Sequence, residues 1–173
     1  MCKSLYPTLA IVFLGANDAR LSKEDIFFQH VPVEDYKTNL TKIVNLLKAE
    51  KLSVILSTPP TLDDEEWNKE CIRKGLPSYN RLKENTKLYA IACKEVARAE
   101  NIPCLDTFSL FENNEENIEK LFSDGLHFSE MGNEIFFKAL VEMLNHQGFD
   151  PQNLNAFLPY YKDIRIVQKQ SEE

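Results

Sequence analysis

The segment LAIVFLGAND, residues 9–18, establishes the fold class of this protein. Residues 9–14 are an unbroken apolar run, which is typical of a parallel β-strand buried on both faces. Gly15 allows the chain to turn at the end of the strand, and Asn17 and Asp18 follow at once. Because open parallel sheets bind ligands at the carboxyl ends of their strands, this turn is a candidate site. An ordinary Asx turn is the alternative for the same residues.

Further along the chain, helices and strands alternate. Apolar residues recur at helical spacing over residues 33–51, with Pro32 suited to the helix start. The remaining predicted elements are a strand at 52–57, a helix at 79–100, a strand at 102–106, and a helix at 130–146 with Ser129 as its N-cap. The acidic run at 63–66 predicts either a helix N-terminus or a solvated face. This alternation predicts an α/β, three-layer architecture with a parallel sheet.

The count of predicted strands is low for such a sheet. Three strands stand against the five or six that are typical, and the most hydrophobic one begins within ten residues of Met1. A strand that is apolar on both faces belongs inside a sheet, so the pattern indicates that an upstream βαβ portion is absent. We expect residues 1–173 to form one domain, with the tail from Phe149 packed over it. The exposed sheet edge would permit self-association.

Composition narrows the class of protein. The formal net charge of −7, without a basic block, argues against nucleic-acid binding. The four cysteines form no C-x-x-C pair, so they are expected to be reduced, structural thiols. No apolar run approaches the length of a membrane span. The run at 9–14 is too short for a signal peptide and is expected to be a strand, which makes a cytoplasmic protein the expectation.

A second candidate site precedes the last predicted helix. Asp124 and His127 lie three apart on a turn that contains Gly125, so the carboxylate can reach imidazole Nδ1 and leave Nε2 as a general base. A plain surface turn is the alternative. Ser57, at a strand end, lacks the G-x-S-x-G surroundings of a nucleophile. His30 and His146 show no partner in the sequence, and no cofactor or metal motif is present.

Taken together, residues 11–18 and 124–133 resemble two signature blocks of the SGNH (GDSL) hydrolases, G-x-N-D and D-x-x-H. Their order and spacing are similar to those of the isoamyl acetate-hydrolysing esterases. The resemblance implies a flavodoxin-like sheet and hydrolysis of small carboxylic esters, such as acetate esters, through an acyl-enzyme. It implies that Asn17 is the oxyanion donor, His127 the base and Asp124 its orienting residue. Asp18 would brace the turn that Gly15 permits.

Two blocks of that family are missing. No G-D-S occurs in the chain. The resemblance therefore implies that the nucleophilic serine and a glycine N–H of the oxyanion hole are missing, and we expect the chain to be N-terminally truncated relative to the family. Since ester cleavage needs an activated hydroxyl beside the base, the isolated chain is expected to be nearly inert. A binding or regulatory pseudo-esterase is one alternative. A flavodoxin-like nucleotide binder is another, although no glycine-rich phosphate loop supports it.

Overall fold

The structure, a computed structural model, describes residues 8–24, 26, 28–114 and 117–149. Its sheet contains the strands β1 (Leu9–Phe13), β2 (Ser53–Ser57) and β3 (Cys104–Leu105), all parallel and in the order β1-β2-β3. Leu9 pairs with Ser53 and Phe13 with Ser57, so β1 and β2 end level with each other. Their carboxyl ends therefore open onto the same edge of the sheet.

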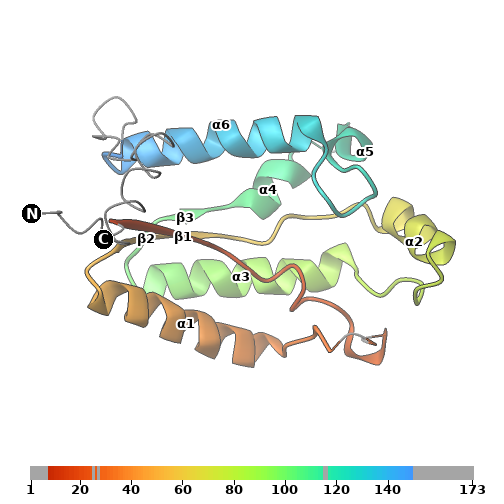
Figure 1. The fold of residues 1–173 in the computed structure, drawn as a ribbon, viewed down its shortest axis with the longest axis horizontal. Coiled ribbons are helices and arrows are strands. Elements are labelled where there is room, and N and C mark those ends of the chain that lie inside the picture. Colours follow the sequence, from red (N-terminus) through yellow and green to blue (C-terminus); the bar gives the residue numbers. More distant parts are fainter. Residues whose placement is uncertain (1–7, 25, 27, 115–116, 150–173) are drawn as a thin grey trace, which may run out of the picture.

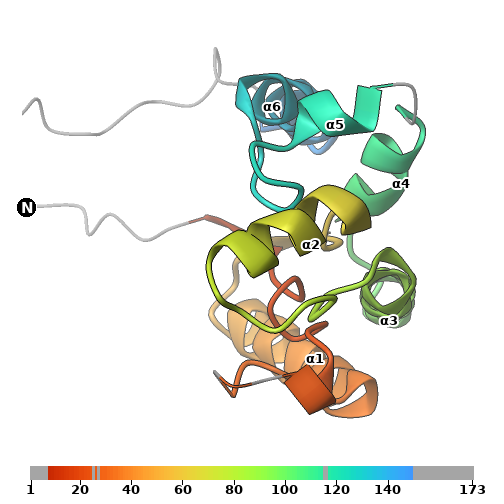
Figure 2. The ribbon, with the colours of Figure 1, turned by 90° about the vertical axis from the view of Figure 1, so that its right-hand side faces the viewer.

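Helices cover both faces of this sheet (Figures 1 and 2). One face carries α1 (Val33–Ala49) and α3 (Lys83–Ala99), and the other carries α4 (Thr107–Glu112), α5 (Ile118–Leu121) and α6 (Glu130–His146). The short 3₁₀ helix η1 (Ser22–Glu24) follows β1, and α2 (Asp64–Arg73) lies beyond the carboxyl ends of the strands. The predicted three-layer α/β class is confirmed.

The helix starts follow the capping rules that the sequence indicated. Pro32 precedes α1 as its N-cap, and Ser129 caps α6 by accepting a hydrogen bond from Gly132 N at 3.1 Å. The acidic run at 63–66 is the start of α2, where Asp63 Oδ1 accepts a hydrogen bond from Glu66 N at 3.0 Å. The helix-terminus interpretation of this run is thus confirmed.

Two groups of apolar side chains hold the layers together. Between the sheet and helices α1 and α3, the buried core includes Leu40, Val44, Leu56, Tyr89 and Val96. On the opposite face, a cluster of aromatic and aliphatic residues joins α4, α5 and α6; its members are Phe111, Leu121 and Phe122, with Phe128, Ile135 and Phe136 packed against them. Phe122 and Phe128 of this second cluster flank the loop that carries His127 and pair with each other as an antiparallel bridge.

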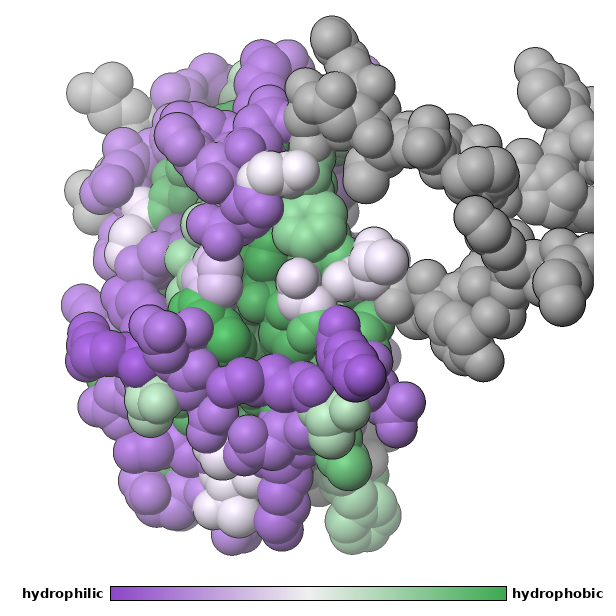
Figure 3. Space-filling model, turned by 90° about the vertical axis from the view of Figure 1, so that its left-hand side faces the viewer, coloured by the Kyte–Doolittle hydropathy of each residue, from purple (hydrophilic) through white to green (hydrophobic). Residues whose placement is uncertain are grey.

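The structure corrects the predicted burial of β1. Within the described residues β1 pairs only with β2, so it lies at the edge of the sheet, and of its five residues only Val12 is buried. Ile11 is 40% exposed and Phe13 37% exposed, whereas Val12 faces the core. Figure 3 views the molecule from the amino ends of the strands and shows hydrophobic side chains gathered across the middle of that face.

Two predicted boundaries are also wrong. The helix expected from residue 79 begins at Lys83, because residues 78–82 form a turn in which Tyr79 has a φ of 50°. The strand expected at 102–106 is limited to Cys104–Leu105, because Asp106 already caps α4 by accepting a hydrogen bond from Ser109 N. The predicted packing of the tail beyond Phe149 and the predicted state of Cys2 lie outside the described residues.

The other cysteines agree with the sequence interpretation. Cys71, Cys93 and Cys104 are free thiols; Cys71 on α2 and Cys93 on α3 are buried, and Cys104 on β3 is half-buried. Within the described residues, none of the helices combines the length and the apolarity that crossing a bilayer demands.

Candidate active site

The loop before α6 brings Asp124 and His127 together. Phe122 and Phe128 form an antiparallel bridge, and Ser123 N donates to His127 O at 2.8 Å, so residues 123–127 make a tight excursion. Asp124 Oδ1 accepts hydrogen bonds from Leu126 N at 3.1 Å and His127 N at 2.8 Å. Asp124 Oδ2 lies 2.8 Å from His127 Nδ1. The carboxylate thus fixes the loop and the imidazole at once.

The surroundings of Asp124 favour its ionised form. Burial acts to raise the pKa of this carboxyl, but hydrogen bonds from the backbone and imidazole of His127 and from Leu126 N outweigh it, so the pKa lies below its ordinary value. The Asp124 side chain is 17% exposed, whereas that of His127 is 68% exposed. One ring nitrogen is therefore engaged by a charged partner, and the ring itself is open to solvent.

This lowered pKa predicts a pH dependence of stability. A carboxyl with a lower pKa in the folded state stabilises the fold above its unfolded pKa, about 3.9, and the stabilisation disappears as the pH falls through the folded value. The difference in unfolding free energy between the wild type and Asp124→Asn should therefore shrink as the pH falls below about 4. Urea unfolding from pH 2 to pH 7 measures it. A difference that does not change with pH would contradict this account.

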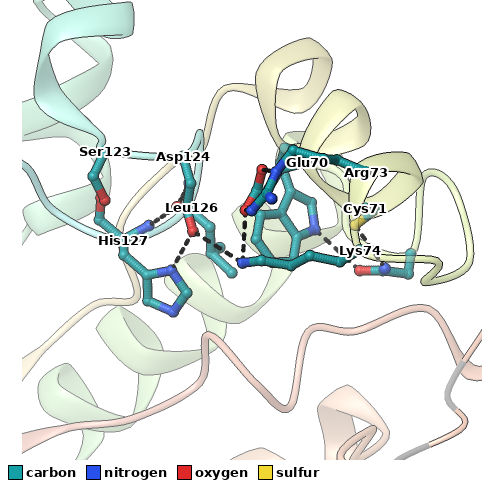
Figure 4. Close-up of polar contacts among 10 residues, drawn as sticks. Glu70, Cys71, Arg73, Lys74, Ser123, Asp124, Leu126 and His127 are labelled. Carbon is teal, nitrogen blue, oxygen red and sulfur yellow. Dashed lines mark hydrogen bonds and ion pairs between the residues drawn. The ribbon is translucent and has the colours of Figure 1, made fainter.

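The loop of residues 123–127, which we call the dyad loop after Asp124 and His127, packs against the start of α2. Gly125 O accepts a hydrogen bond from Asp63 N at 2.9 Å, and the Trp67 ring meets the His127 ring edge-on, with centroids 6.1 Å apart. Figure 4 shows Lys74 reaching toward the same carboxylate; its Nζ lies 3.9 Å from Asp124 Oδ2. Helix α2 and its C-terminal cap therefore place the Trp67 ring against His127 and the Lys74 ammonium near Asp124.

The second half of the site is the turn after β1. Gly15 has a φ of +116°, and a Cβ there would lie 3.0 Å from Tyr36 Oη, so the position requires glycine on two grounds. Ala19 N donates to Gly15 O and Arg20 N to Asn17 O, each at 3.0 Å. Asn17 is exposed at the rim of the sheet. Asp18 O accepts a hydrogen bond from Val31 N at 3.2 Å, which ties the turn to the segment before α1.

A surface pocket joins the two halves. Its volume is about 350 Å³. The lining residues come from the end of β1 and the turn after it, the segment after β2, the loop before α6, and α6 itself: Phe13, Leu14, Ala16, Pro60, Leu126, His127, Phe128 and Asn133. Ala16, the neighbour of Asn17, thus shares a pocket with His127, although the two lie in distant parts of the chain. The pocket therefore reaches from the turn after β1 to His127, although Asn17 itself is not among its lining residues.

The remaining sequence candidates have other roles. Ser57 is 1% exposed, and its Oγ lies 2.7 Å from Thr107 Oγ1, so it is a buried strand-end serine, as its lack of a nucleophile motif indicated. His30 Nδ1 lies 2.6 Å from Arg20 O, and His146 lies 3.8 Å from Glu142 at the end of α6. No group of three or more His, Cys, Asp or Glu in the described part of the chain could hold a metal ion.

Sequence reasoning missed three residues that contact the candidate site. Trp67 and Lys74 approach the dyad from α2, and Arg81 approaches Asn17 from the turn before α3. Trp67, as the only tryptophan of the chain, was a weak signal. Nothing local in the sequence marks Lys74 or Arg81, because their positions follow from how the segment between α2 and α3 crosses the end of the sheet.

The family of the chain follows from the order and placement of these two blocks. The sequence model of the GDSL-like lipase/acylhydrolase family matches residues 3–135, which include both the Asn17 turn and the dyad loop. The chain belongs to this family. The family resemblance that the sequence indicated is therefore confirmed, and so is the fold class that it implied.

Curated relatives of this GDSL-like chain are esterases. It is 38% identical over 161 residues to the isoamyl acetate-hydrolyzing esterase 1 homolog of Mus musculus, which covers 91% of this chain and 63% of the mouse protein. It is 30% identical over 159 residues to the isoamyl acetate-hydrolyzing esterase of Saccharomyces cerevisiae, covering 90% of this chain and 65% of the yeast protein. The chain thus spans slightly under two thirds of the length of these relatives.

A solved structure shows the same arrangement of elements. The lipase/acylhydrolase from Enterococcus faecalis superposes with a TM-score of 0.64 at 27% identity, covering 82% of this chain and 63% of that one. An acetylxylan esterase from Geobacillus stearothermophilus shares the fold, with a TM-score of 0.63 at 22% identity.

Proposed function

We propose that this chain provides the general base, the orienting carboxylate and a side-chain oxyanion donor for hydrolysis of small carboxylic esters, such as acetate esters. The observation that carries the proposal is the 2.8 Å contact between His127 Nδ1 and Asp124 Oδ2 at the rim of the pocket. Its relatives in mouse and yeast, both named as isoamyl acetate-hydrolyzing esterases, support the substrate class.

Each residue has a role that its geometry supports. With Nδ1 bound to Asp124, His127 keeps Nε2 to accept a proton from an attacking hydroxyl and to return it to the leaving alcohol. Asp124 holds the tautomer and stabilises the imidazolium as it forms. Asn17, exposed at the end of β1, donates its amide N–H to the oxygen on which negative charge develops.

The attacking hydroxyl is the part that this chain does not offer in the described residues. Ser57 is buried, Ser123 Oγ donates to His127 O, and Ser129 Oγ donates to Lys120 O. An acyl-enzyme mechanism needs a hydroxyl within about 2.6–3.2 Å of the base. We therefore propose that a serine-bearing strand from additional polypeptide pairs with the open edge of β1, whose carboxyl end leads to the site.

The proposal predicts that hydrolysis of p-nitrophenyl acetate depends on His127. Because general-base assistance is worth about 10²–10⁴ in rate, even slow hydrolysis above the buffer rate should be lost in His127→Ala. His146→Ala is the matched control, since it removes an equally exposed histidine that has its own carboxylate neighbour. Initial rates at pH 7.5 measure the effect. Equal rates for the wild type and His127→Ala would overturn the proposal.

A second candidate is a binding or regulatory pseudo-esterase that associates through the sheet edge. The observation that favours it is the apolar edge itself, where Ile11, Phe13 and Leu14 are all at least one third exposed. A second copy of the chain is one partner that such an edge accepts. Hydrolysis independent of His127, together with a stable dimer in light scattering, would favour this function over catalysis.

We place the protein in the cytoplasm, acting as one domain on small esters of lipid metabolism without binding nucleic acid. The net charge of −7 argues against binding to phosphate backbones.

A further inference from the structure

Arg81, in the turn before α3, contacts the side chain of Asn17, the candidate oxyanion donor. It is 5% exposed, and among the described residues its guanidinium donates to three oxygens of two neighbouring loops. Nη1 donates to Ala16 O, and Nη2 donates to Asn17 Oδ1 at 2.9 Å and to Gln29 Oε1 at 3.0 Å. The residue therefore ties the backbone and the side chain of the Asn17 turn to one fixed cation.

The chemistry of this contact fixes the orientation of the Asn17 amide. A guanidinium has N–H donors and no acceptor, so it can form a hydrogen bond only with the oxygen of a facing carboxamide and not with its N–H₂ group. The amide of Asn17 is planar, and with Oδ1 held by Arg81 its Nδ2–H₂ group must lie on the other side. The positive charge also polarises the amide, which makes its N–H groups better donors.

The segment that carries Arg81 is itself held rigidly. The neighbouring Asn80 is fully buried; its Oδ1 accepts from Trp67 Nε1 at 3.0 Å, and its carbonyl accepts from Leu21 N at 2.9 Å. Trp67 in turn meets the His127 ring. One turn therefore contacts both the oxyanion side and, through Trp67, the base side of the site.

We propose that Arg81 is a positioning residue that holds the Asn17 carboxamide with its N–H₂ group toward the acyl site. The proposal rests on the ester-hydrolase function proposed above. Arg81 acts through Asn17 and touches neither the substrate nor the base. Without Arg81 the amide is free to rotate, and water or substrate meets its oxygen as often as its nitrogen.

The first test reads the amide directly and needs no catalysis. In the full chain labelled with ¹⁵N and ¹³C, Arg81→Met should shift the Asn17 ¹³Cγ resonance upfield and move the Nδ2–H₂ resonances toward those of a free asparagine. Arg81→Lys keeps the charge without the fork and should give an intermediate shift. Arg98→Met removes an exposed arginine of α3 and should change neither signal. Unchanged Asn17 signals in folded Arg81→Met would overturn the proposal.

The second test is a double-mutant cycle on p-nitrophenyl acetate hydrolysis. Arg81→Met should lower the His127-dependent rate by about 10- to 100-fold, and Asn17→Ala by at least as much. In the Asn17→Ala background, Arg81→Met should cause no further loss, because the residue through which it acts is gone. Two losses that multiply would assign Arg81 a separate role and overturn the proposal. If His127→Ala leaves hydrolysis unchanged, the ester-hydrolase function fails, and the Asn17 resonances alone decide the role of Arg81.

Discussion

Replacing Gly125 with alanine is expected to destabilise the protein more than a change of one methyl group normally does. Gly125 has a φ of +85°, and a Cβ there would lie 2.3 Å from Trp67 N and 2.8 Å from Asp63 O. Both are backbone atoms at the start of α2, so neither can rotate away. The loop must lift off the helix and lose the hydrogen bond between Asp63 N and Gly125 O. We expect a loss of about 3 kcal/mol or more.

The chain offers a matched control for this substitution. Gly75, after α2, also has a positive φ, at +67°, but a Cβ there meets nothing within 4 Å. Gly75→Ala therefore adds only the conformational penalty, about 1–2 kcal/mol. Urea unfolding of the two variants separates conformational strain from the close approach. Equal destabilisation would show that the contact with α2 is not what makes glycine necessary at 125.

The substitution Asp124→Asn is expected to remove the whole His127-dependent rate while leaving the loop folded. The amide oxygen can still accept from Leu126 N and His127 N, as Oδ1 does now. The amide N–H₂ group of the new asparagine then faces His127 Nδ1. Because this group is a hydrogen-bond donor, Nδ1 must act as the acceptor and the ring must carry its proton on Nε2. A base protonated at Nε2 cannot accept a proton from a hydroxyl. The equivalent change in a serine protease costs about 10⁴ in kcat.

Two readouts distinguish this tautomer effect from a general loss of structure. The ¹⁵N shifts of the imidazole should show Nδ1 changing from protonated to unprotonated, and p-nitrophenyl acetate hydrolysis should fall to the level of His127→Ala. Glu70→Gln is the control; it makes the same carboxylate-to-amide change in a residue that binds Lys74 and Arg73 but not the imidazole. An unchanged tautomer in Asp124→Asn would refute the role given to this carboxylate.

The parts of the fold that local chemistry determines were predictable from the sequence. Helix α6 has the predicted bounds because Ser129 caps it and its apolar residues recur at helical spacing. The strand at 9–13 and the dyad loop were predictable for the same reason, since Asp124 and His127 interact across only three residues. In each case the contacts that determine the structure are close in sequence.

What the sequence did not reveal depends on neighbours that are distant in the chain. The apolar pattern of β1 predicted burial on both faces, but burial depends on which strands lie beside it, and the described sheet ends there. Helix α3 starts later than predicted because the turn before it makes tertiary contacts. Asn80 Oδ1 accepts a hydrogen bond from Trp67 Nε1, and Asp64 Oδ1 accepts one from Lys83 N at 2.7 Å. Arg81 became visible only when this turn was placed against Asn17.

Because the dyad loop is short, the pairing of His127 with Asp124 and the placement of Asn17 differ in their entropic cost. Closing a ring between residues three apart sacrifices little chain entropy, so the imidazole and its carboxylate can pair as soon as their own turn forms. Bringing the turn that carries Asn17 to the same pocket requires the whole sheet and the crossing between α2 and α3. Variants that loosen the scaffold should therefore misalign the amide long before they separate the histidine from its aspartate.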